Sequence, residues 1–74
     1  MNGVIIKTIA SDHRGKYGFI KDEDGQDRYF SSKELVGVAF ENLHIGDQVS
    51  FDPAVGGRNN AGLRAAGVHK ADGV

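Results

Sequence analysis

Residues 16–31, KYGFIKDEDGQDRYFS, decide the fold. Two short runs rich in aromatic residues, Tyr17 to Ile20 and Arg28 to Ser31, flank the turn signal Asp24-Gly25. Runs of this kind, four residues or longer and bounded by polar turn residues, indicate strands. Asp-Gly between two such runs is a strong hairpin signal. These residues therefore predict a β-hairpin.

Three further strands are predicted on either side of this hairpin. Val4 to Ile9 is rich in β-branched residues, and Leu63 to His69 forms the last strand. Gln48 to Phe51 alternates so that Val49 and Phe51 share one face, and we expect Pro53 to end this strand. The longer connection, Ser32 to Asn42, has room for one helical turn capped by Ser32.

Five short strands with a long connection between the third and the fourth favour a closed β-barrel. A sheet of this size has edges that need protection, and closure of the sheet removes them. The prediction is an all-β fold, a five-stranded antiparallel Greek-key barrel of the OB type. A β-sandwich ranks second, because it normally needs about seven strands and about 100 residues.

The composition is that of one small globular domain. The chain has 74 residues, of which 39% are hydrophobic and 26% charged, and a net charge of -1. We expect a single domain at 1–70 with a flexible tail at 71–74. Without cysteine there is no disulfide framework or thiolate site, and no apolar run is long enough for a membrane span. These features predict a soluble cytoplasmic protein.

The two predicted hairpin strands concentrate aromatic rings on one face. Tyr17 and Phe19 are two residues apart and share a face, and in the next strand Tyr29 and Ser31 do the same. Ile20 and Phe30 then point to the other face. Exposed rings beside cations are typical of a base-stacking surface. The alternative interpretation is that the three rings belong to the core, as strand aromatics often do.

Several segments together resemble the cold-shock domain, over almost the whole chain and in the same order. The resemblance rests on Gly3 to Ile5, Lys16 to Ile20, Asp27 to Phe30, Leu35, Gly46 to Phe51, and Arg64 to Val68. It implies an OB-type barrel that binds single-stranded RNA or DNA, often as an RNA chaperone. Within it, Tyr17 to Ile20 is similar to the first ribonucleoprotein motif and Asp27 to Ser31 to the second.

The resemblance also implies which residues contact nucleic acid. Tyr17, Phe19 and Tyr29 fall where the family has stacking aromatics, and Phe40 falls where it has another in the long connection. Lys7 and Ser31 stand where the family usually has tryptophan and histidine, and Ser32 stands at a further aromatic position. We expect phosphate or base-edge contacts from Lys7, Lys16, Arg58 and Arg64.

The charge is unevenly distributed along the chain. Residues 1–21 carry a net +3, residues 22–53 carry -6, and residues 54–74 carry +2. If the first two strands adjoin the last, a basic surface surrounds the rings despite the near-neutral total. The alternative is that these charges only solvate the surface.

Other sites find little support in the sequence. His13, His44 and His69 lack short metal-ligand spacing, so we predict surface histidines and no metal. The acidic run at residues 22–24 lacks the pattern of a calcium loop, and Gly56-Gly57-Arg58 has no helix after it to bind a phosphate.

The leading hypothesis is therefore a single-stranded RNA- or DNA-binding module that is not an enzyme. It needs no cofactor and acts on no small-molecule substrate or membrane, with a role as an RNA chaperone or as a cold-shock-type regulator of transcription or translation. The first alternative is an OB-fold protein-interaction module that has lost nucleic-acid binding. A small hydrolase or metal enzyme is the second. We expect a monomer, with a strand-exchanged dimer as the other oligomeric state.

Overall fold

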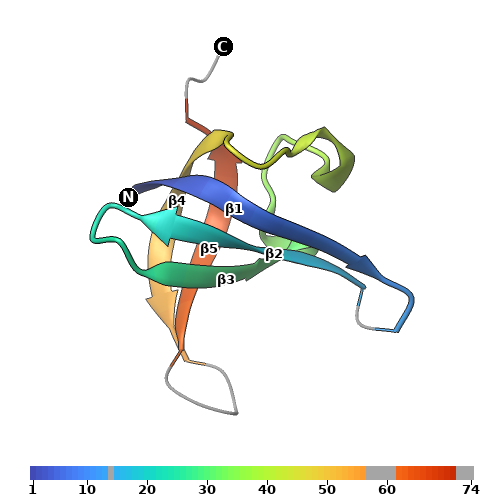
Figure 1. The fold of residues 1–74 in the computed structure, drawn as a ribbon, viewed down its shortest axis with the longest axis horizontal. Coiled ribbons are helices and arrows are strands. Elements are labelled where there is room, and N and C mark those ends of the chain that lie inside the picture. Colours follow the sequence, from blue (N-terminus) through green and yellow to red (C-terminus); the bar gives the residue numbers. More distant parts are fainter. Residues whose placement is uncertain (14, 57–61, 72–74) are drawn as a thin grey trace.

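The computed structural model describes residues 1–13, 15–56 and 62–71, which form five β-strands and two short 3-10 helices (Figure 1). The five predicted strands are confirmed, each somewhat longer than its sequence pattern. No helix in this part of the chain is long and apolar enough to cross a membrane. The elements are β1 (Asn2–Ser11), β2 (Gly15–Asp22), β3 (Asp27–Ser31), η1 (Ser32–Glu34), η2 (Phe40–Asn42), β4 (Gln48–Val55) and β5 (Leu63–Lys70).

The strands form a closed barrel in the order β1-β2-β3-β5-β4, with β4 returning to β1, so the predicted all-β barrel of the OB type is confirmed. β1 to β3 form an antiparallel meander, β4 runs antiparallel to β1, and β5 folds back along β4. This path makes β5 parallel to β3, the exception to the predicted antiparallel pairing. Among the described residues β3 and β5 share one ladder pair, Tyr29 with Arg64, supplemented by a bridge between Leu35 and Val68.

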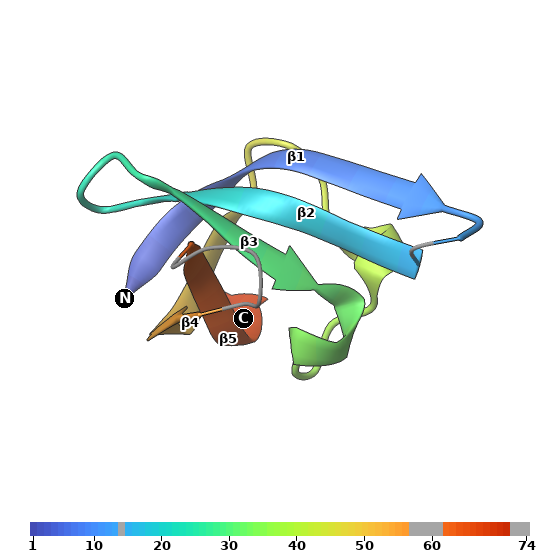
Figure 2. The ribbon, with the colours of Figure 1, turned by 90° about the horizontal axis from the view of Figure 1, so that it is seen from below.

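β1 bends so that it pairs with both β2 and β4. Its first residues pair with β4, and the register with β2 shifts between Ile5 and Lys7, where β1 has a bulge. Beyond the bulge, β1 and β2 continue as a hairpin that projects from the barrel, on the right of both views (Figures 1 and 2). The outer surface of β2 and β3 is therefore continuous with this projecting hairpin.

The core lies inside the barrel and draws on every strand. The alternation predicted from sequence is confirmed, because Ile20 and Phe30 point inward and Val49 and Phe51 share the inner face. The buried hydrophobic residues are Ile5, Ile20, Phe30, Leu43, Val49, Phe51, Ala65 and Val68.

Two local predictions were wrong. β4 does not end at Pro53 but continues to Val55. Proline is tolerated there because β1 pairs with β4 only at its first residues, so β4 has β5 on one side and an edge on the other. The connection holds two 3-10 turns rather than one, and Ser32 is not the cap: η1 follows Ser31, which makes no capping side-chain bond.

Candidate functional site

Tyr17, Phe19 and Tyr29 form a cluster of rings on the outer surface of β2 and β3, here called the ring triad. Phe19 pairs directly with Tyr29 across the two strands. The ring centroids lie 5.7 Å apart for Tyr17 and Tyr29, 5.9 Å for Phe19 and Tyr29, and 6.4 Å for Tyr17 and Phe19. All three side chains are partly exposed, whereas Ile20 and Phe30 are fully buried. The interpretation of these rings as core residues is therefore wrong.

Two predicted cations border the ring triad. The guanidinium carbon of Arg64, in β5, lies 4.8 Å from the centroid of the Tyr29 ring, within the range of a cation–π contact. Lys7 is exposed on β1 and pairs across the strands with Phe19. The barrel thus brings strands β1 and β5 to opposite sides of the rings, which is the arrangement that a basic surface around them requires.

The other predicted site residues are placed differently. Ser31 pairs with Tyr17 and lies beside the triad, but Lys16 is one residue out of phase with Tyr17 and forms an ion pair with Glu41 of η2. Phe40 is also in η2 and makes no ring contact within the described residues. Arg58 lies outside the described residues, as do positions 72–74 of the predicted tail. The tail's first residue, Ala71, donates its N–H to the Gln48 carbonyl at 3.0 Å.

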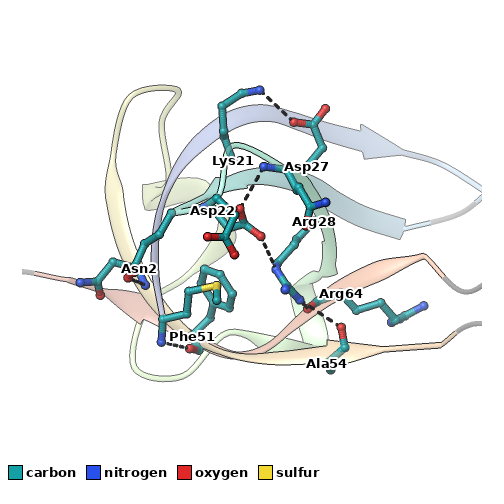
Figure 3. Close-up of polar contacts among 12 residues, drawn as sticks. Asn2, Lys21, Asp22, Asp27, Arg28, Phe51, Ala54 and Arg64 are labelled. Atoms are coloured by element: carbon teal, nitrogen blue, oxygen red, sulfur yellow. Dashed lines mark hydrogen bonds and ion pairs between the residues drawn. The ribbon is translucent and has the colours of Figure 1, made fainter.

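A buried ion pair that was not predicted lies at the hairpin end of β2 and β3. Arg28 donates from Nε to Oδ2 of Asp22 at 2.7 Å, with side chains 8% and 0% exposed (Figure 3). A signal was present in the sequence. Asp22 has the phase of the inward-facing Ile20, and Arg28 has that of the inward-facing Phe30, so alternation places both charges inside the barrel.

Hydrogen bonds hold the pKa of the Asp22 carboxyl below its usual value of 3.8. The largest cause is the backbone N–H of Gln26, and the Arg28 side chain and the N–H of Asp24 add to it against the opposing effect of burial. The pKa values of Glu41 and Asp47 are lowered as well, chiefly by hydrogen bonds from Lys16 and Lys70.

Acid is therefore expected to destabilise the fold through Asp22. A lowered folded-state pKa gives stability that is present above the unfolded value and is lost as the pH falls below it, through the folded pKa. We expect the Tm of the wild type to be steady from pH 7 to about 5 and to fall below about 4. The asparagine of Asp22→Asn cannot titrate, so this variant lacks the acid-sensitive contribution. Circular dichroism melts should show that its Tm is lower than that of the wild type at pH 7 and that the difference shrinks in acid. A deficit of constant size from pH 7 to pH 3 would contradict this assignment.

The described residues hold no metal-binding cluster, and the ring triad does not line the pocket found among them. Among residues 1–13, 15–56 and 62–71, no three histidine or acidic side chains gather as metal ligands, and the three histidines are exposed as predicted. A pocket of about 320 Å³ lies near the ends of β1, β2 and β4, and no residue of the ring triad lines it. Its lining residues are Asn2, Gly3, Val4, Lys21, Asp22, Glu23, Gln48 and Ala71. The ring triad thus lies outside this pocket, on the outer surface of β2 and β3.

The chain matches no model of a known protein family, and no curated protein is significantly similar to it.

Proposed function

We propose that this protein binds single-stranded RNA or DNA by stacking unpaired bases on the ring triad. One observation carries the proposal: three partly exposed aromatic rings touch one another on the outside of the barrel, with the Arg64 guanidinium over one of them. Bases have flat π faces, and stacking on a protein ring contributes about 1 to 3 kcal/mol per base. The proposal therefore requires a ligand with bases that are free to stack.

Single strands meet this requirement better than duplexes do. A duplex stacks its bases on each other and presents only their edges, whereas a single strand can turn bases onto protein rings. Lys7 and Arg64, on either side of the triad, are suited to contact the phosphates that follow such bases.

The charges near the site favour contact with a short segment of a nucleic-acid strand, in a manner sensitive to salt. Asp27 lies on the same strand as Tyr29, two residues toward the hairpin turn, and pairs with Lys21 at 3.2 Å. Exposed Glu23 and Asp24 follow in the turn. These carboxylates repel phosphates, so a bound strand is expected to run along Lys7 and Arg64 and to avoid the turn.

The resemblance to the cold-shock domain supports the same proposal and extends it to a role. A module that binds single strands without strong sequence preference traps RNA segments whenever they unpair, and so favours their melted state. We propose the role of an RNA chaperone or of a cold-shock-type regulator of transcription or translation on this ground.

The test is a titration of fluorescently labelled oligonucleotides followed by anisotropy. We expect single strands to bind more tightly than a duplex of the same length. With two phosphate contacts, raising the salt from 50 to 200 mM should weaken binding about sevenfold. Pyrimidine-rich and purine-rich strands of both RNA and DNA are compared, because nothing in the ring geometry selects among them.

Two outcomes would overturn the proposal. One is the absence of binding to every strand by a protein that circular dichroism shows to be folded. The other is equal affinity for duplex and single strand, which indicates charge attraction without stacking. A protein partner that is captured from a lysate and survives nuclease treatment would, together with the first outcome, favour the protein-interaction barrel.

A further inference from the structure

Arg28 lies where the barrel has its shortest strand ladder among the described residues, between β3 and β5. Most strand pairs form ladders of several residues, whereas β3 and β5 share the single pair Tyr29 with Arg64 among the described residues. The bridge between Leu35 and Val68 and the ladder with β4 also hold β5, but at the level of Tyr29 a further contact ties it to β3. The Arg28 side chain provides it from within the barrel (Figure 3).

Arg28 connects three strands through one guanidinium group. Its Nη1 donates to the carbonyl of Arg64 at 2.8 Å and to the carbonyl of Ala54 at 3.1 Å, so that β3 is tied to both β5 and β4. The group also lies 5.7 Å from the centroid of the Phe51 ring in the core. Because the carbonyl that Arg28 holds belongs to Arg64, it fixes the backbone of the residue whose side chain lies over Tyr29.

Asp22 in turn fixes Arg28. Its Oδ2 accepts the bond from Arg28 Nε, and its Oδ1 accepts the backbone N–H groups of Asp24 and Gln26 at 2.9 Å each. The carboxylate is therefore held by the β2–β3 turn and orients the guanidinium plane. The planar, forked guanidinium can satisfy the carboxylate and two carbonyls together, which a lysine ammonium at the same place cannot do in this geometry.

We infer that Arg28, oriented by Asp22, is a positioning residue that holds Arg64 over Tyr29 and thereby completes the binding surface. Its effect on binding rests on the proposed function, whereas its effect on the Arg64–Tyr29 contact does not. Arg28 itself is buried, so its role is to position Arg64.

The experiment follows the Arg64–Tyr29 contact directly by NMR. The guanidinium carbon of Arg64 lies over the Tyr29 ring, so the neighbouring side-chain protons should resonate upfield in the wild type. In Arg28→Lys we expect at least half of that upfield shift to disappear while the strands remain folded. Asp22→Asn combined with Arg28→Met is a second variant. It removes both buried charges together, an exchange that folded proteins often tolerate, and the asparagine oxygen can still accept the turn N–H groups.

Oligonucleotide binding supplies the second readout. We expect Arg64→Ala to weaken single-strand binding about three- to tenfold, and Arg28→Lys to weaken it by a similar factor. The variant that combines Arg28→Lys with Arg64→Ala should bind no more weakly than Arg64→Ala alone, because both changes remove the same contact. Lys70→Met is the matched control. It breaks the 2.9 Å ion pair between β5 and Asp47, at the far end of the same strand, and should leave both readouts unchanged.

The two proposals fail in different ways. An unchanged Arg64 upfield shift in both Arg28 variants would overturn the positioning role. Fully additive losses of affinity in the variant that combines Arg28→Lys with Arg64→Ala would also overturn it. Loss of the shift in Lys70→Met as well would also overturn the positioning role, because the Arg64–Tyr29 contact would then respond to the loss of any contact that holds β5. If the shift collapses as expected but the wild type binds no nucleic acid, the positioning role stands and the proposed function fails.

Discussion

Replacement of Tyr17 and Phe19 together by alanine is expected to weaken single-strand binding at least about 30-fold. Each ring is worth about 1 to 3 kcal/mol in stacking, so the loss of one stacked base from each ring removes about 2 kcal/mol or more. The change should leave the barrel folded, because both side chains lie on the outer surface and neither belongs to the buried core. Anisotropy titration of a labelled single strand measures the effect.

Two controls separate stacking from other contributions. Tyr17→Phe keeps the ring and removes only the hydroxyl, so its affinity should stay within about twofold of the wild type, less than the loss of one stacked base. Val4→Ala truncates an apolar side chain that is 37% exposed and lines the pocket described above, which no residue of the triad lines, and it should have no effect. If the double alanine variant is folded and binds within threefold of the wild type, the stacking mechanism is wrong.

Gly18→Ala, between the two rings, is expected to destabilise the fold severely. A Cβ at position 18 would overlap the Lys7 carbonyl oxygen and lie 2.9 Å from two atoms of the Phe30 ring. Neither neighbour can yield easily, because one is the backbone of β1 and the other is a fully buried ring. Overpacking of this kind costs about 3 kcal/mol, near the upper end of its usual range. For a domain of this size that corresponds to a Tm lower by about 12 to 24 °C.

Gly25→Ala is the matched comparison for the Gly18 variant. Gly25 adopts φ +79° in the β2–β3 turn and an added Cβ would meet nothing within 4 Å, so the cost there is backbone strain alone. That cost is about 1 kcal/mol, or roughly 4 to 8 °C. Thermal melts should therefore rank Gly18→Ala well below Gly25→Ala. Equal Tm losses would mean that β1 and Phe30 relax around the new methyl group.

The ring triad was predictable because it depends only on local geometry. Alternation decides which way Tyr17 and Phe19 point, and the short Asp-Gly turn decides that Tyr29 arrives beside them. The same alternation applied to charges identifies Asp22 and Arg28 as inward-facing residues. The ion pair was nevertheless not predicted, because charged residues are rarely fully buried unless they are paired and no partner was assigned to either residue.

The parts that could not be predicted depend on contacts between distant segments. Phe40 was expected at the rings, but the path of the long connection decides where it lies, and η2 instead reaches β2 through the ion pair of Glu41 with Lys16. Likewise, the continuation of β4 through Pro53 depends on which neighbours the strand has, since proline is excluded only where both edges are paired. A single sequence does not specify such neighbours.

The parallel contact between β3 and β5 has a consequence for the order in which the molecule assembles. Tyr17, Phe19 and Tyr29 come from neighbouring strands joined by a tight turn, whereas Tyr29 and Arg64 are far apart along the chain. Contacts between distant segments carry a larger loop-closure cost and form more slowly. During synthesis the rings can therefore meet before β5 has left the ribosome, and their cation arrives with the last strand. The ring triad is thus joined by its cation only when the whole barrel has closed.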